Sequence, residues 1–224
     1  MREILNFDDL PSEYTSNCIG SGANGSAYKI DDKYVFKTFK NPTYFEANVK
    51  ELFNVYLNSF VLPKKLVYVN GKFVGYIMDY VNGQTLDNIS DNTSISTYIN
   101  SLKRLEYDLA ALSTYNFFII DFKDKNIMVN ENDELKVIDT DLYTKIKTKD
   151  LYAYNLANLS YAVIKPFLNL FVDGIEDEKL DYKRRQLLEG RYLPSRFMEN
   201  INSYSNNSNS NIREFKDQVK LLLK

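Results

Sequence analysis

Three oxygen-bearing side chains stand at set intervals in the segment IIDFKDKNIMVNENDELKVIDTD, residues 119–141. Asp121 and Asn126 lie close together in the chain, and Asp139 follows a short hydrophobic, strand-like run. Carboxylate and amide oxygens are the ligands that a hard cation such as Mg²⁺ prefers. Two interpretations follow from this spacing: an acidic hairpin on the protein surface, or a set of side chains that converge on a cationic ligand.

A glycine-rich stretch and a lysine precede that segment. The stretch IGSGANGSAYKI has Gly20, Gly22 and Gly25 in the pattern G-x-G-x-x-G, which lets backbone N–H groups approach phosphate oxygens because no Cβ atom intervenes. It joins two strand-like segments, whereas a Rossmann fingerprint opens a helix. Lys37 ends the next apolar strand, where a lysine usually extends its ammonium to water. Its place one strand beyond the glycines favours a phosphate-binding role instead.

The elements that position these residues begin with strands. Through the first eighty residues, β-branched and aromatic residues alternate or cluster around turns. Asn70 and Gly71 form a strong hairpin signal between two of these segments. The predicted strands cover residues 15–20, 26–31, 33–39, 65–69 and 73–80. With one helix they make a small antiparallel sheet domain over residues 1–80.

Helices are predicted in the rest of the chain. The helix of the first domain falls in residues 41–60, where Thr43 and Glu46 form a T-x-x-E capping box. From residue 83 the pattern is mainly helical, and residues 81–224 make a second domain. Its predicted helices are an amphipathic one over 94–116, one over 151–171 that is apolar on most faces, and a last one that carries Ile212, Phe215, Val219 and Leu222. The fold class is α+β.

In chain order these motifs resemble the nucleotide site of the protein kinase-like superfamily. Asp121 and Asn126 match the interval of the catalytic-loop pattern H-R-D-L-K-x-x-N, and Asp139 stands at the D-F-G position. The glycine stretch resembles the loop over the nucleotide phosphates, Lys37 matches the lysine of V-A-I-K, and GYIMDYV is similar to a kinase hinge. The resemblance covers about residues 16–143. It implies a bilobal kinase-like fold, with a small sheet lobe that holds one helix and a mainly helical second lobe.

The resemblance also implies a catalytic role for each matching residue. Asp121 would accept or orient the substrate hydroxyl, and Lys123 would neutralise charge on the transferring phosphoryl group. Asn126 and Asp139 would hold Mg²⁺, which bridges the phosphates of the cofactor ATP.

A helix carboxylate would orient the ammonium of Lys37. Glu51 is preferred for that role, because Glu46 already has a capping role. In the hinge, Met78 would be the gatekeeper behind the adenine. The residues expected to contact the nucleotide are Gly20, Gly22, Gly25, Ala27, Val35, Lys37, Met78, Asp79, Val81 and Met128.

The sequence departs from the kinase pattern around its catalytic motifs. Ile119 and Ile120 replace the histidine and arginine of H-R-D, so activation through a phosphorylated loop is not expected. D-F-G has become D-T-D, and the following segment is too short for a full activation segment. Asp141, which ends D-T-D, is expected to be a solvated turn residue, with assistance to a metal as the alternative. Asn155 stands where many kinases have an aspartate that braces the catalytic loop. These departures resemble compact relatives such as RIO kinases and aminoglycoside phosphotransferases.

Composition narrows the classes of function. The net charge of −2, with basic and acidic residues interleaved, predicts no general attraction to nucleic acid or to a membrane surface. The chain has no histidine, which excludes Ser-His-Asp chemistry and histidine-ligated metal sites. The single cysteine, Cys18, and the lack of a long apolar run or signal peptide predict a cytoplasmic protein.

The expected activity is transfer of the γ-phosphoryl group of ATP to a hydroxyl, with Ser or Thr of a protein as the expected acceptor. Lys123 resembles the loop of Ser/Thr protein kinases and supports that acceptor. One alternative is a small-molecule kinase that acts on an antibiotic, sugar or amino alcohol. Another is a pseudokinase, a nucleotide-binding scaffold without turnover, although Lys37 and both metal ligands are retained.

Overall fold

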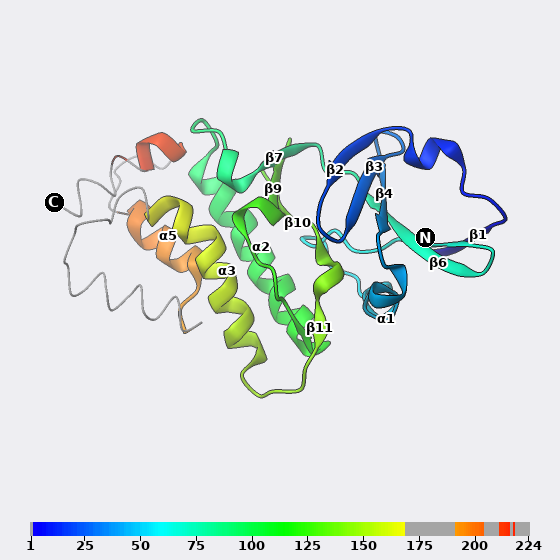
Figure 1. Ribbon diagram of the computed structural model, residues 1–224. Coiled ribbons are helices and arrows are strands. Elements are labelled where there is room, and N and C mark those ends of the chain that lie inside the picture. Colours follow the sequence, from blue (N-terminus) through cyan, green and yellow to red (C-terminus); the bar gives the residue numbers. More distant parts are fainter. Residues whose placement is uncertain (1, 169–190, 204–210, 216, 218–224) are drawn as a thin grey trace. The chain divides into compact units, whose positions relative to one another are not determined.

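The computed structural model describes residues 2–168, 191–203, 211–215 and 217, and shows a mixed α+β architecture (Figure 1). The chain divides into two units, 1–82 with 139–142, and 83–138 with 143–224. The sequence placed the boundary after residue 80 and did not assign 139–142 to the first unit. Among the described residues, every helix is too short or too polar to cross a lipid bilayer.

A six-stranded sheet forms the first unit. Its order is β1-β5-β6-β4-β3-β2, and all neighbours are antiparallel except β1 and β5. Asn70 and Gly71 both have positive φ, as the predicted turn between β5 and β6 requires. The strands are β1 (Glu3–Phe7), β2 (Cys18–Ser21), β3 (Gly25–Lys29), β4 (Tyr34–Phe39), β5 (Lys65–Val69) and β6 (Lys72–Asp79). Strand β1 was not predicted, because it pairs with a strand far along the chain.

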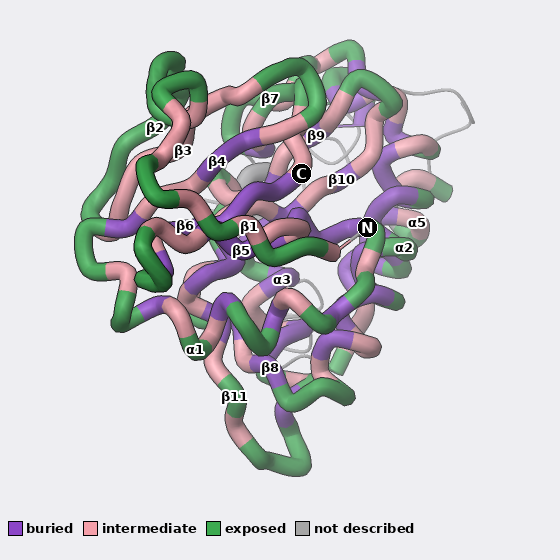
Figure 2. The backbone as a smooth tube through the Cα atoms, turned by 90° about the vertical axis from the view of Figure 1, so that its right-hand side faces the viewer, coloured by how far each residue is buried: buried purple, intermediate pink, exposed green. Residues whose placement is uncertain are grey.

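The two faces of this sheet have different environments. Side chains alternate along a strand, so Phe36 of β4 faces away from its neighbours Val35 and Lys37. Phe36, Val67 and Ile77 form a buried cluster on the first face, and Figure 2 shows buried stretches of β4 and β6. The other face carries Lys37 and is called the lysine face below.

Helix α1 (Pro42–Leu52) packs against β4 and β6 on the lysine face. Phe45 stacks on Phe39 with 4.3 Å between ring centroids, and the buried side of the helix repeats at Val49 and Leu52. The helix ends well before residue 60, and just beyond its end the Asn54 side chain donates to the Lys50 carbonyl at 3.3 Å.

The capping box predicted for α1 is wrong. Asn41 is the N-cap residue, so Thr43 lies inside the helix. The Glu46 carboxylate instead pairs with Lys50 one turn later, at 2.6 Å. Proline at the first helical position starts the helix earlier than the capping pattern indicated.

Helices dominate the second unit. Helices α2, α3 and α5 contact one another, and the N-cap residue of α2 is Ser94, whose hydroxyl accepts the Thr97 N–H. The helices are α2 (Ile95–Thr114), α3 (Leu151–Leu168) and α5 (Pro194–Ser203). The strands are β7 (Gly83–Thr85), β9 (Ile127–Asn130) and β10 (Leu135–Val137), in the order β10-β9-β7, and the pair β8 (Phe117–Phe118) and β11 (Thr144–Lys145).

Two helix predictions in this unit hold only in part. Helix α3 is buried at Leu156, Leu159 and Val163, as its apolar pattern predicts, but it also carries the exposed Tyr152 and Tyr154. Tyrosine counts as apolar in a sequence pattern, but its hydroxyl favours water. Of the last predicted helix, Ile212 and Phe215 are buried, and Val219 and Leu222 lie outside the described residues.

A buried carboxylate ties α5 to α2. Glu106 of α2 accepts hydrogen bonds from the Ser195 backbone N–H at 2.7 Å and from the Ser195 hydroxyl at 2.6 Å. Ser195 lies in the first turn of α5, where backbone N–H groups need acceptors. Burial raises the pKa of Glu106, and the hydrogen bonds from Ser195 oppose that shift.

Glu106→Gln should remove a pH dependence of stability. Because the pKa of Glu106 is raised in the folded state, the unfolded chain loses the Glu106 proton at lower pH than the folded chain. The wild-type free energy of unfolding therefore falls as pH rises from the unfolded-state pKa through the folded one. Urea denaturation from pH 4 to 8 measures the free energy of unfolding of both proteins. As pH rises over that window, the wild-type value should fall relative to the value for Glu106→Gln. A difference that is constant across the range would contradict this.

Gly25→Ala should destabilise the first unit. A Cβ atom at Gly25 would lie 1.9 Å from the carbonyl oxygen of Thr38 on the paired strand. The expected loss is about 3 kcal/mol in the free energy of unfolding, since the contact is with backbone that cannot turn away. Gly22→Ala is the matched control, because no atom lies within 4 Å of its added Cβ. Equal denaturation midpoints for the two variants would refute the close packing of β3 on β4.

Candidate functional site

Lys37 stands in the middle of the sheet of the first unit. In the strand register it lies between Ala27 of β3 and Tyr76 of β6, so these three side chains share the lysine face. Its side chain is 12% exposed, which is too buried for a lysine that only reaches out to water. The ammonium therefore needs negatively charged partners.

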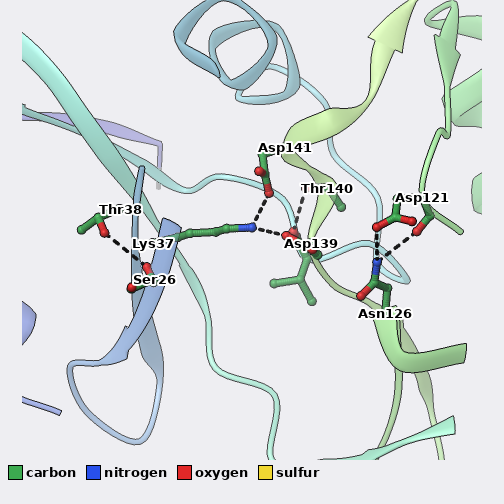
Figure 3. A network of polar contacts seen from close by, with 9 residues as sticks. Ser26, Lys37, Thr38, Asp121, Asn126, Asp139, Thr140 and Asp141 are labelled. Carbon is green, nitrogen blue, oxygen red and sulfur yellow. Dashed lines mark hydrogen bonds and ion pairs between the residues drawn. The ribbon is translucent and has the colours of Figure 1, made fainter. Parts of the chain in front are cut away.

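Two aspartates supply that charge. The ammonium of Lys37 donates to Asp139 Oδ1 and to Asp141 Oδ1, and Figure 3 shows both side chains pointing at it. Lys37 and Asp139 are 102 residues apart in the sequence. The structure thus brings together two residues that the motif order had assigned to one site.

The charges of this cluster are coupled. Burial acts to lower the pKa of Lys37, but the negative charges of Asp141 and Asp139 outweigh it and raise that pKa. Lys37 is therefore a cation across the physiological range. Burial raises the pKa of Asp141, against the opposing effect of the Lys37 charge. The pKa of the Tyr76 hydroxyl is raised by its burial and then by the same two carboxylates.

A sharp turn of the backbone places the two aspartates. Asp139 has φ of +60°, a left-handed conformation that aspartate tolerates better than most residues. A 3-10 helix, η4 (Thr140–Leu142), follows at once and contacts α1. The Thr140 hydroxyl donates to the Val61 carbonyl at 3.4 Å. These contacts hold the segment within the first unit.

The glycine stretch is the hairpin turn between β2 and β3. The Gly22 N–H donates to the Gly25 carbonyl at 2.9 Å and closes the turn. Gly20 and Gly22 have open space where a Cβ would lie, whereas Gly25 is required for packing against β4. The ammonium of Lys40 donates to the Gly22 carbonyl at 3.0 Å. This places a second cation at the turn, which the sequence pattern did not indicate.

The residues predicted to line an adenine pocket occupy β4, β6 and the chain just after β6. Val35 pairs with Met78 in the register, and both are buried on the lysine face. Asp79 ends β6, and its carboxylate pairs with Lys64 at 2.6 Å. Val81 lies in the following loop and is half-buried. Their contact with a base stays a prediction.

The acids predicted to orient Lys37 lie on α1. Glu51 is exposed, and Glu46 pairs with Lys50 and accepts from the Tyr68 hydroxyl at 3.3 Å. Asp139 and Asp141 are the carboxylates that contact the Lys37 ammonium. A role for Glu51 stays a prediction. The expectation that Asp141 is a solvated turn residue is wrong, because its side chain is 1% exposed and pairs with Lys37.

The second unit holds its own group of predicted catalytic residues. Asn126 Nδ2 donates to the Asp121 carbonyl at 3.0 Å and to its carboxylate at 3.3 Å (Figure 3). Lys123 pairs with the Asp121 carboxylate at 2.5 Å. The 3-10 helix η3 (Asp124–Asn126) makes this approach possible, because it returns Asn126 to the start of the loop. Met128 follows on β9, where it pairs with Thr85 of β7.

Helix α3 holds the backbone next to Asp121. Asn155 is fully buried, and its Oδ1 accepts the Ile119 N–H at 3.0 Å. Its Nδ2 donates to the Phe117 carbonyl at 2.8 Å and to the Ser113 hydroxyl at 2.9 Å. One turn later Asn158 donates to the Ile119 carbonyl at 3.0 Å.

Both peptide groups of Ile119 are therefore bound by α3. The sequence predicted a bracing role for Asn155 but missed Asn158. The spacing of the two asparagines, three residues apart on one helix face, was the available signal.

The side chains proposed to bind Mg²⁺ supply only part of the ligands that the ion needs. Among the described residues, three or more Asp, Glu, Cys or His side chains do not gather into one metal cluster. Mg²⁺ sites with nucleotides usually use one or two carboxylates, with phosphates and water completing the shell. The Asp139 side chain is 41% exposed and so accessible to a cation. Asn126 directs its NH₂ group at Asp121, which leaves its Oδ1 for a cation.

Comparison with protein-family models and with curated protein sequences found no match to this chain. The functional assignment therefore depends on the residues themselves and on their geometry.

Asn155→Ala should cost about 3 kcal/mol of unfolding free energy, since three buried hydrogen bonds at about 1 kcal/mol each are lost. Asn158→Ala, which removes one bond to the same residue, should cost about 1 kcal/mol. Urea denaturation of both variants measures the difference. Equal losses would show that Asn155 does not carry the brace.

Proposed function

We propose that the protein is an ATP-dependent phosphotransferase with a bilobal protein kinase-like fold. It transfers the γ-phosphoryl group to a hydroxyl, and a Ser or Thr side chain of a protein is the proposed acceptor. The observation that carries this proposal is the buried contact of Lys37 with Asp139, two residues that the kinase-like motif order assigns to one nucleotide site. A surface hairpin would have left the 139–141 segment away from the lysine.

Lys37 and the glycine turn are proposed to bind the nucleotide phosphates. The positive charge of Lys37 and its fixed position suit an anionic ligand that arrives with a cation, since Asp139 and Asp141 already balance the ammonium. Lys40 adds a second cation at the turn, next to the Gly22 carbonyl that it binds. Sheet residues on the lysine face, including Ala27, Val35 and Met78, offer an apolar surface for a base.

Asp139 and Asn126 are the proposed ligands of Mg²⁺. When bound, the ion neutralises charge that develops on the phosphates during transfer. Asp139 brings a carboxylate that is accessible to solvent, and Asn126 brings an amide oxygen. With only these protein ligands, the nucleotide itself must complete the shell, so metal and nucleotide should bind together.

Asp121 is the proposed residue that accepts or orients the acceptor hydroxyl. Asn126 and Lys123 contact its carboxylate and limit its rotation. Asn155 and Asn158 fix the backbone two residues before it. Such positioning, together with electrostatic stabilisation, accounts for most of the rate gain in phosphoryl transfer.

A small-molecule hydroxyl is the second candidate acceptor. Helix α3 begins at Leu151, soon after η4 ends at Leu142. The chain between them forms β11 and one short loop, which leaves little length for a peptide-docking segment. This observation favours a compact acceptor such as a sugar or an amino alcohol.

Asp121→Asn should lower phosphotransfer by about 10²–10⁴-fold, since the carboxylate that takes the hydroxyl proton is lost. The assay incubates the protein with γ-labelled ATP and Mg²⁺, with the protein and metabolite fractions of a cell lysate offered separately. Label in Ser or Thr of proteins supports the proposed acceptor, and label only in metabolites supports the second candidate.

Asp133→Asn is the matched control for that experiment. It makes the same chemical change in the same unit, at a turn residue with φ of +56° that asparagine also tolerates. Its activity should equal that of wild type. Full activity in Asp121→Asn would refute the proposed role, and ATP binding without any transfer by wild type would identify a scaffold.

A further inference from the structure

We propose that Asp141 is the positioning residue that keeps the Lys37 ammonium in place. Asp139, in contrast, releases Lys37 and binds a metal cation when the nucleotide binds. This division of roles rests on the proposed function and deepens it. Lys37 contacts both aspartates, so the question is which contact persists when a nucleotide binds. Burial, chain geometry and the surroundings of each carboxylate give the same answer.

Burial separates the two carboxylates. The Asp141 side chain is 1% exposed, whereas the Asp139 side chain is 41% exposed. A ligand that arrives from solvent can reach Asp139, whereas the Asp141 side chain is closed to it. A buried carboxylate that lost its cation would stand uncompensated in an apolar interior, which is strongly unfavourable. The Lys37–Asp141 pair is therefore the permanent one.

The surroundings of Asp141 make it depend on Lys37. Its second oxygen, Oδ2, is buried away from solvent. The buried hydroxyl of Tyr76, the cross-strand neighbour of Lys37, lies beside the same two carboxylates, and its pKa is raised by burial and by their charges. The Lys37 ammonium is thus the partner that compensates the charge of Asp141.

The segment that carries Asp141 is held firmly in the first unit. The Thr140 hydroxyl donates a hydrogen bond to the Val61 carbonyl, and η4 packs against α1. Asp141 therefore approaches Lys37 from η4, while Glu51 lies on the exposed side of α1. Orientation of the lysine then requires no carboxylate from the helix, and the pair is assembled whenever the first unit is folded.

A double-mutant cycle tests this assignment through nucleotide affinity. Titration calorimetry would measure Mg²⁺·ATP and adenosine binding to wild type, Asp141→Asn, Lys37→Met and the double variant. Asp141→Asn should weaken Mg²⁺·ATP binding about tenfold, which is about 1.4 kcal/mol. The double variant should lose no more than Lys37→Met alone, because Asp141 acts through Lys37. Adenosine, which lacks phosphates, should bind all four proteins within about twofold.

Asp139→Asn is the matched control, since asparagine also tolerates the left-handed conformation at that position. It should abolish the gain in ATP affinity that Mg²⁺ brings, whereas Asp141→Asn should keep part of that gain.

Three outcomes would overturn the assignment: unchanged Mg²⁺·ATP affinity in Asp141→Asn, additive losses in the cycle, or an equal loss of adenosine binding. An equal loss of adenosine binding would identify a purely structural role for Asp141. If Lys37→Met does not fold, thermal unfolding of Asp141→Asn tests for that structural role instead. Wild type that binds neither ATP nor adenosine would instead refute the proposed function itself.

Discussion

The need to compensate one buried positive charge organises the first unit. A lysine ammonium on the inner face of a sheet loses most of its hydration, and only close carboxylates can offset that loss. Asp139 and Asp141 provide them, although the chain on both sides of 139–142 belongs to the second unit. The left-handed turn at Asp139 and the contacts of η4 with α1 are the structural means by which this short segment reaches the lysine.

Hydrogen bonds from side-chain amides hold the loop around Asp121 in the second unit. Asn155 and Asn158 bind the N–H and the carbonyl of Ile119, and Asn126 binds both the backbone and the side chain of Asp121. Amides satisfy a buried backbone without adding charge, so the brace carries no ionisation cost. The backbone that precedes Asp121 is thus held by uncharged amides, while its own carboxylate pairs with Lys123.

The proposed activity joins these two physical arrangements. One holds a permanent cation and an accessible carboxylate, which suit a metal-bound polyphosphate, and the other holds a carboxylate in a restrained loop, which suits an acceptor hydroxyl. The short connection from η4 to α3 bears on the size of the acceptor and not on the nucleotide. Nucleotide binding and acceptor choice are therefore separate questions with separate experiments.

Local patterns in the sequence determined most of the elements and the order of the motifs. Alternation indicated β3, β4, β5 and β6, helical spacing indicated α1 and α2, and Asn70-Gly71 indicated a hairpin turn that has the expected positive φ values. These signals are readable because each depends on residues within one or two turns or strands. Only the tertiary structure decided that Asp141 is the buried partner of Lys37, that Gly25 is needed for packing against β4, and that Asn158 holds Ile119. Each of these depends on contacts between distant segments, where burial sets the strength of a charge pair and backbone distance sets the room for a side chain.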